Sequence, residues 1–316
     1  MKNILYSIFV IITFIISSCA PINDFIIQGD EKYDKGNYVE AIELYNKAIE
    51  QEEDRSDYYY KRGKAKFYLN DFDGSVADYN KAIELDNSRA NYYLNRGVSF
   101  ISLSRYNEAA NDLDAAINMD SSNVEAYFSR GYLRTLQENY SGALDDYNKV
   151  ISLDSLNSKA YMNRANLKGD LEEYSSAIDD YDKVLAIDSL NEDAYFNRGY
   201  DKGMIGGYQQ AIEDFDKVTE INPNNIDAYF LKGDTKRILE DYEGALSDYS
   251  KILSIDAKNA KALFKRGMTF LQLKNKKSAC EDLTTSANLG YIEAFPEVDK
   301  NCKAPPSKKK INKKKK

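Results

Sequence analysis

The side chains that could do chemistry in this chain are carboxylates, tyrosines and three cysteines. The 316 residues include 51 Asp and Glu, 26 Tyr, no His and no Trp. Without histidine, a Ser-His-Asp triad, a Cys-His pair and an imidazole metal site are excluded. Paired carboxylates remain a route to hydrolysis, but the acids recur at fixed intervals, and no phosphate loop or zinc spacing is present. We therefore expect no enzyme, no catalytic residue, no cofactor and no metal ligand, and keep a carboxylate-based hydrolase as a remote alternative.

The first cysteine follows a segment with the features of an export signal. Lys2 precedes residues 4–16, which are almost wholly apolar and too short for a comfortable membrane span. Ile16-Ser17-Ser18-Cys19 resembles the bacterial lipobox. The resemblance implies a lipoprotein signal peptide over residues 1–18, lipidation of Cys19 and a lipidated anchor over residues 19–21. An ordinary signal peptide with an incidental cysteine is the alternative.

The residue after Cys19 helps to predict in which membrane the lipoprotein is anchored. By resemblance to lipoprotein sorting, Ala20 is not the Asp that retains such proteins in the inner membrane, and no acidic run that would favour surface export follows Cys19. Several acyl chains give stable anchoring where one gives marginal binding. We therefore expect an envelope lipoprotein on the outer membrane, facing the periplasm and lipid-anchored. Export also makes nucleic acid an unexpected partner.

The other two cysteines, Cys280 and Cys302, lie near the C-terminal end. In an oxidising compartment they could form a disulfide. The bond would close a loop of about 22 residues and contribute roughly 3 kcal/mol in the chain-entropy model. Two free buried thiols are the alternative.

A repeat of 34 residues organises most of the chain after Cys19. Small residues recur at that spacing: Gly29, Gly63, Gly97, Gly131, Ala165, Gly199, Gly233 and Gly267. Nine positions further lies an aromatic ring in the first seven repeats, from Tyr38 to Tyr242, with Lys276 in the eighth. Ala or Ser follows after three more positions, and Tyr, Phe or Leu after another four. Eight repeats thus run from 22 to 293.

The pattern resembles the tetratricopeptide repeat (TPR), with its small residue at position 8, aromatic at 17, Ala at 20 and aromatic at 24. The resemblance implies an all-α, right-handed superhelical solenoid of eight helix-turn-helix units. Neighbouring units must stack, because one unit cannot bury its apolar face alone. Repeat 8 departs from the pattern at Lys276 and Ser286. We expect residues 294–302 to form a capping helix.

In the resembling family, the first helices line a concave groove that positions 2, 5, 6, 9, 12 and 13 face. Here these positions supply rings, apolar side chains and amides, which can hold the side chains and backbone of an extended peptide. The alternative is that position 5 packs between repeats and position 9 is ordinary surface. The candidate groove residues are Tyr60, Leu94, Asn95, Phe128, Tyr132, Met162, Asn163, Asn166, Phe196, Asn197, Tyr200, Phe230 and Phe264.

Two further patterns concern the groove and its support. A carboxylate clamp of the chaperone type is rejected, because position 5 is never Lys. Gly169 and Gly203 stand at position 12 of adjacent repeats. We hypothesise a widened groove around repeats 5 and 6, between Met162, Asn163, Phe196, Asn197 and Tyr200; drift after a local duplication is the alternative. Arg at position 7 and Asp at position 23 recur through most repeats. We interpret them as a structural ladder of ion pairs.

The remaining segment, residues 303–316, holds eight Lys and no acid, although the whole chain has a formal charge of −8. It is typical of a disordered tail. Adhesion to an anionic surface and a merely solvated terminus are the two interpretations.

Together these features predict a protein–protein interaction scaffold that binds protein or peptide partners. Related lipoproteins serve in outer-membrane assembly, or in pilus or secretion machinery. A cell-wall glycan-binding lipoprotein is the competing hypothesis.

Overall fold

The computed structural model describes residues 24–302, which form 17 α-helices and no strand. The prediction of an all-α fold built from repeated helix pairs is confirmed. The proposed signal peptide, Cys19 with its anchor, and the Lys-rich tail lie outside the described residues. Within the described part, no helix has the length and apolar character needed to cross a membrane.

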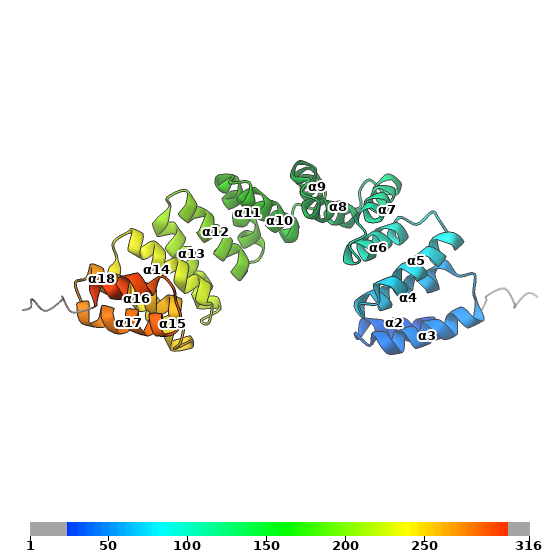
Figure 1. The fold of residues 1–316 in the computed structure, drawn as a ribbon. Helices are drawn as coiled ribbons and strands as arrows, with labels where there is room; N and C mark the ends of the chain where they lie inside the picture. The colour runs from blue at the N-terminus through cyan, green and yellow to red at the C-terminus, as the bar shows by residue number, and fades with distance from the viewer. Residues whose placement is uncertain (1–23, 303–316) are drawn as a thin grey trace, which may run out of the picture. The chain divides into compact units, whose positions relative to one another are not determined.

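Contacts divide the chain into two bodies in the loop between repeats 4 and 5, between Ser155 and Leu156. The N-terminal body contains repeats 1–4, each a pair of successive helices that pack on one another (Figure 1). Its helices are α2 (Asp24–Asp34), α3 (Tyr38–Gln51), α4 (Ser56–Tyr68), α5 (Phe72–Leu85), α6 (Ala90–Ser102), α7 (Tyr106–Met119), α8 (Val124–Leu136) and α9 (Tyr140–Leu153).

The C-terminal body contains repeats 5–8, built in the same way, and one further helix that packs on α17. Its helices are α10 (Ser158–Asp170), α11 (Tyr174–Ile187), α12 (Glu192–Met204), α13 (Tyr208–Ile221), α14 (Ile226–Ile238), α15 (Tyr242–Ile255), α16 (Ala260–Gln272), α17 (Lys276–Asn288) and α18 (Ala294–Asn301).

The close packing inside a repeat depends on small residues. The residue at position 20 of every repeat, Ala or Ser, is fully buried. Position 8 is a glycine in seven repeats, where it lies against the side chain at position 24 of its own repeat, and the fully buried Ala165 in repeat 5. In repeat 7, a Cβ on Gly233 would lie 2.8 Å from Cε1 of Tyr249, which is fully buried. Such a distance leaves no room for a methyl group, so glycine at this position sets how closely the two helices approach.

The turn inside each repeat has the same left-handed residue, at position 15. Glycine occupies it in two repeats, where Gly36 and Gly206 have φ of 76° and 81°. In the six others a non-glycine residue adopts φ between 57° and 62°, as Glu138 does at 59°. Residues without glycine's freedom seldom adopt this conformation. The turn is therefore held by the helices that it joins.

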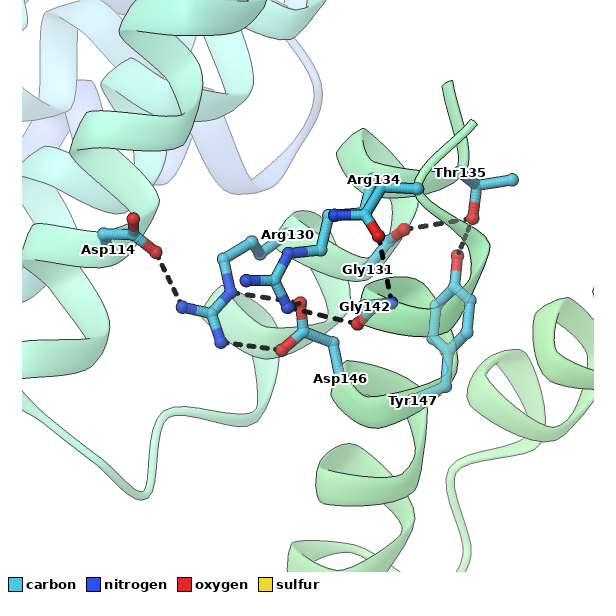
Figure 2. Close-up of polar contacts among 9 residues, drawn as sticks. Asp114, Arg130, Gly131, Arg134, Thr135, Gly142, Asp146 and Tyr147 are labelled. Atoms are coloured by element: carbon cyan, nitrogen blue, oxygen red, sulfur yellow. Dashed lines mark hydrogen bonds and ion pairs between the residues drawn. The ribbon is translucent and has the colours of Figure 1, made fainter. Parts of the chain in front are cut away.

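The predicted Arg–Asp ladder is present within both bodies. In Figure 2, Arg130 of α8 donates to Asp146 of α9 at 2.7 and 3.0 Å and also to Asp114 of the preceding repeat at 2.6 Å. Arg134 adds a contact to Asp146 at 2.8 Å. The same pattern recurs where Lys232 replaces arginine: its ammonium pairs with Asp248 and with Asp216 of the preceding repeat. Arg130 and Lys232 thus each join three helices of adjacent repeats.

The C-terminal end of the array is closed by α18. Pro296 lies in its first turn, where a missing N–H costs no helical hydrogen bond. A disulfide joins Cys280 of α17 to Cys302, the residue after α18, with Cα atoms 5.4 Å apart. Ser286, the departure from the repeat pattern, is fully buried and donates to the carbonyl of Ala260 at 2.7 Å. The disulfide thus holds the last helix on repeat 8, and the Ser286 hydrogen bond joins the two helices of that repeat.

Candidate functional site

The predicted groove residues at position 5 lie on the first helices and contact position 24 of the same repeat. Phe128 lies 6.0 Å from Tyr147, and Phe196 lies 6.1 Å from Phe215, measured between ring centroids. Tyr60, Phe128, Met162, Phe196 and Phe264 are half-buried. Each of these side chains therefore has one side in the repeat core and one side toward solvent.

Two members of the predicted set lie deeper. Leu94 is 3% exposed and Phe230 is 7% exposed. At these two positions the structure favours the packing interpretation over the open groove. Repeats 3 and 7 therefore present less apolar surface at position 5 than their neighbours do.

The predicted amides form hydrogen bonds between neighbouring first helices. Asn197 of α12 donates to the side chain of Asn166 on α10 at 3.0 Å, and the Tyr181 hydroxyl donates to the same oxygen at 2.7 Å. In the N-terminal body, Asn95 of α6 donates to the Tyr60 hydroxyl of α4 at 3.3 Å. Asn163 lies half-buried on α10. The amides thus support the surface as well as lining it.

The predicted tyrosines at position 9 are the most exposed rings of the set. Tyr132 of α8 is 45% exposed and Tyr200 of α12 is 46% exposed. An exposed aromatic ring can bury a large area on a partner at low cost in side-chain entropy. These two rings are the residues of the set best placed for direct contact.

A hollow of about 630 Å³ lies in the C-terminal body, between α10, α11 and α12. Its walls include Gly169, Phe196, Asn197 and Tyr200, which belong to the region where the sequence suggested a wider groove. The absence of a side chain at Gly169 leaves part of this space empty. Met162 and Asn163, also assigned to that region, are not among its walls. Gly203 lines a smaller hollow of about 180 Å³ beside it.

The hollow also contains residues that the sequence analysis missed. Asp170 and Glu172, at the end of α10 and in the following turn, lie in its wall with Asp201 of α12. Asp201 is 4% exposed, and its Oδ2 atom has no hydrogen-bond partner. The sequence held a signal for it: Asp201 stands at position 10, where repeats 2–5, 7 and 8 place Ala, Ser, Leu, Leu, Thr and Thr.

The electrostatics of the hollow agree with this placement. Burial, and then the charge of Asp170, raise the pKa of Asp201 to about 6. Burial also raises the pKa of Tyr181, with further contributions from the charges of Asp201 and Asp170. Burial and the charge of Glu172 raise the pKa of Tyr174. The acids and rings therefore form one electrostatic neighbourhood with a negative potential.

Two other hollows lie near Tyr60 in the N-terminal body. The first, of about 290 Å³, includes Asp30 and Asp34, but Lys61 and Lys64 share its wall and Lys61 pairs with Asp30. The second, of about 540 Å³, is polar and includes two arginines. These arginines, Arg55 and Arg89, pair with Asp57 and Asp86. Across residues 24–302, no group of three or more acids and cysteines is arranged to hold a metal ion.

Comparisons with solved structures give the same fold at low sequence identity. The C-terminal part of a TPR repeat-containing protein from Cytophaga hutchinsonii is 19% identical, with a TM-score of 0.65 over 76% of this chain and 98% of that one. YrrB, described as a TPR protein with an unusual peptide-binding site, is 23% identical, with a TM-score of 0.51 over 60% and 97%. PilF from Pseudomonas aeruginosa is 18% identical, with a TM-score of 0.52 over 68% and 98%.

Sequence comparison identifies the family directly. Models described as TPR repeat match residues 29–67 and 63–103, and models described as tetratricopeptide repeat match residues 94–158, 158–189 and 226–259. No curated protein sequence matches the chain significantly. The matched segments cover more than half of the chain and coincide with the helix pairs and the small-residue contacts inside them, and the chain therefore belongs to the tetratricopeptide repeat family.

Proposed function

We propose that this protein is an envelope lipoprotein that organises other proteins by binding their segments on its first-helix row. This row comprises the side chains at positions 5, 6 and 9 of the first helix in each repeat. The broader statement, that a TPR array serves protein–protein interaction, follows from family membership. The specific surface and the cellular address are our proposal.

The observation that carries the proposal is the half-exposed state of this row. Phe128, Phe196 and Phe264 keep one side toward solvent, and the rings of Tyr132 and Tyr200 are nearly half exposed. Amides accompany the rings on α6, α10 and α12. Rings and amides together suit an extended peptide, whose side chains need apolar contact and whose backbone needs hydrogen bonds. YrrB, described as having a peptide-binding site, shares this fold.

The address rests on the sequence alone. Ile16-Ser17-Ser18-Cys19 resembles a lipobox, and we propose that Cys19 is acylated and anchors the protein to the periplasmic side of the outer membrane. The Lys-rich tail would add attraction to anionic headgroups. Metabolic labelling with an alkyne fatty acid should tag the protein, and Cys19→Ala should abolish the tag. Equal labelling of both chains would remove the lipid anchor from the proposal.

Within the envelope, we propose service in outer-membrane assembly, or in pilus or secretion machinery. The similarity to PilF concerns the fold and does not choose among these machines. The captured partner would name the machine.

Glycan binding is the second candidate, because exposed tyrosines such as Tyr132 and Tyr200 can stack on sugar rings. The experiment tests the purified chain against two fractions from the same cells. The first test identifies the proteins that the chain retains, and the second measures whether the chain sediments with purified cell wall. Retention of one protein, lost in the variant Tyr132→Ala/Tyr200→Ala, supports the scaffold. Sedimentation with cell wall, lost in the same variant, supports glycan binding and contradicts the scaffold.

A further inference from the structure

Two residues in the wall of the hollow between α10, α11 and α12 depart from the repeat pattern. Position 10 is buried in repeats 2–8, and only repeat 6 puts a carboxylate there, Asp201. Position 12 of the preceding repeat is Gly169, whereas repeats 1–4 have Tyr, Phe, Ile and Thr. A Cβ on Gly169 would lie 3.3 Å from Oδ2 of Asp201, so the carboxylate faces the space that the glycine leaves.

A carboxylate at this position cannot be satisfied as its counterparts are. Ser99, Thr235 and Thr269 each donate to the carbonyl four residues earlier, at 2.7 to 3.0 Å. An ionised carboxylate has no hydrogen to donate. Oδ2 of Asp201 has no partner at 4% residue exposure, and leaving a buried polar group unpaired is costly.

The chain supplies no cation to this group. None of the residues that line the hollow is basic. The basic residues next in sequence to the walls are paired elsewhere: Lys168 with Asp180 at 2.7 Å, and Arg198 and Lys202 with Asp214 at 2.5 and 2.8 Å. The lack of a basic partner distinguishes this hollow from the one in repeats 1 and 2, where Lys61 already pairs with Asp30.

The walls around the carboxylates are aromatic. Tyr174 and Tyr181 of α11 and Phe196 and Tyr200 of α12 line the hollow, and Tyr200 is 46% exposed at its edge. Aromatic faces attract ammonium and guanidinium groups, and they also cover the apolar stem of a long basic side chain. No group of three or more acids or cysteines in residues 24–302 is placed to hold a metal ion, which favours an organic cation.

We propose that this hollow receives the arginine or lysine side chain of a partner segment, with Asp201 as its counter-ion and Tyr200 packed against its stem. The proposal rests on the scaffold function above and gives its partner a chemistry: an extended segment with a basic anchor residue. The polarity is opposite to that of a carboxylate clamp, in which basic side chains receive an acidic peptide end. The volume of about 630 Å³ exceeds that of one side chain and leaves room for flanking backbone.

The test uses four fluorescein-labelled, terminally blocked peptides with one alanine-rich frame and a single central residue: arginine, citrulline, lysine or norleucine. Citrulline keeps the length of arginine without its charge, and norleucine keeps the four-carbon side chain of lysine without its ammonium group. Anisotropy titration with the purified full chain near neutral pH should show the arginine and lysine peptides binding at least about tenfold more tightly than their neutral counterparts, as expected for a charge-assisted hydrogen bond.

Two variants locate the effect. Asp201→Asn should abolish the preference for charge, and Gly169→Leu should weaken all four peptides by filling the hollow. The matched control is Asp227→Asn, which removes one exposed negative charge on α14, outside the hollow. Circular dichroism confirms that each variant is folded. If Asp227→Asn abolished the preference as fully as Asp201→Asn does, general charge attraction would replace the proposed site.

The preference should also shrink near pH 5. The other titratable groups in the wall of the hollow are Asp170 of α10, Glu172 of the following turn, Tyr174 and Tyr181 of α11, and Tyr200 of α12. Because burial and the charge of Asp170 raise the pKa of Asp201 to about 6, protonation of Asp201 near pH 5 removes the counter-ion. A preference that is the same near pH 5 and near neutrality would contradict the assignment to Asp201.

The remaining outcomes separate this proposal from the scaffold function. If the charged and neutral peptides bind equally, the basic anchor is wrong and peptide binding stands. If millimolar calcium chloride removes the preference at constant ionic strength, the hollow is a metal site and the proposal is overturned. If no peptide binds, the proposal is also overturned. Crosslinking from Tyr132, in the other body, then shows whether the scaffold function fails with it.

Discussion

At the scale of single residues, the burial of Asp201 should make the stability of the protein depend on pH. Its pKa is about 6 in the folded chain, against about 3.9 when unfolded. Between these values the folded state holds more protons than the unfolded state, so stability falls as the pH rises. The penalty is absent below about pH 4 and complete above about pH 6.

The variant Asp201→Asn lacks this titration. Relative to the natural chain, it should gain up to about 3 kcal/mol of unfolding free energy between pH 4 and pH 7, because one pKa unit corresponds to about 1.4 kcal/mol. Urea denaturation at a series of pH values measures the gain. Asp227→Asn should show no comparable pH dependence. A constant difference between Asp201→Asn and the natural chain across the range would show that Asp201 ionises normally.

Two glycines of the C-terminal body should respond oppositely to the same substitution. Gly233→Ala would place a Cβ 2.8 Å from the buried Tyr249 ring and should destabilise by about 1–3 kcal/mol. Gly203→Ala has its nearest neighbour, the Cβ of Ala211, at 4.0 Å and should stabilise by about 1 kcal/mol. Thermal and urea denaturation compare the two. Equal loss in both would show that the contact with Tyr249 does not set the helix spacing.

At the scale of helices, the Arg–Asp ladder should behave as a buried network rather than as surface pairs. Arg130→Ala leaves Asp146, which is 2% exposed, with Arg134 as its remaining basic partner. Loss of one partner from a buried pair costs about 3–5 kcal/mol. Arg130→Lys should lose less, because Lys232 holds the same position in repeat 7. Denaturation midpoints measure these losses of stability. A loss below about 1 kcal/mol for Arg130→Ala would be typical of an exposed pair and would contradict a buried network.

The disulfide should stabilise the C-terminal end rather than all helices equally. Cys280→Ser/Cys302→Ser removes a loop constraint worth roughly 3 kcal/mol. In a stacked array, each repeat contacts only its neighbours. Hydrogen exchange should therefore rise in α17 and α18 and stay unchanged in α4 and α5. A uniform rise along the chain would contradict this local role.

The helix pairs could be predicted from the sequence because the same pattern of residue types recurs in all eight repeats. The small residue at position 8, Ala at 20 and the ladder residues at 7 and 23 are each explained by a contact in the structure. Their periodicity makes them visible without coordinates. The hollow was harder to predict because its carboxylate departs from the period. Asp201 becomes meaningful only when its burial and its position opposite Gly169 are known.

Leu94 and Phe230 show a second limit of the pattern. The register places them with Phe128 and Phe196, yet their side chains are buried. Exposure at position 5 depends on the side chains that surround it in the neighbouring helices. The position of a residue within the repeat does not determine this exposure. The turn residue at position 15 is a third case: its left-handed backbone is invisible where Glu138 or Lys274 replaces glycine.

At the scale of the whole molecule, the protein contains two bodies of four repeats, and both carry the first-helix row. The central claim is that partner proteins contact the first-helix row. A photoreactive residue at Tyr200, which is 46% exposed, reports on this row in living cells. The matched control is the same residue at Tyr140, which is 38% exposed at the start of a second helix.

Mass spectrometry of the crosslinked material gives the most direct answer. The account predicts one dominant envelope protein crosslinked from Tyr200 and little from Tyr140, with the crosslinked peptide carrying a basic residue. Crosslinks to protein from Tyr140 with none from Tyr200, or glycan alone at Tyr200, would contradict the claim that partners bind on the first-helix row.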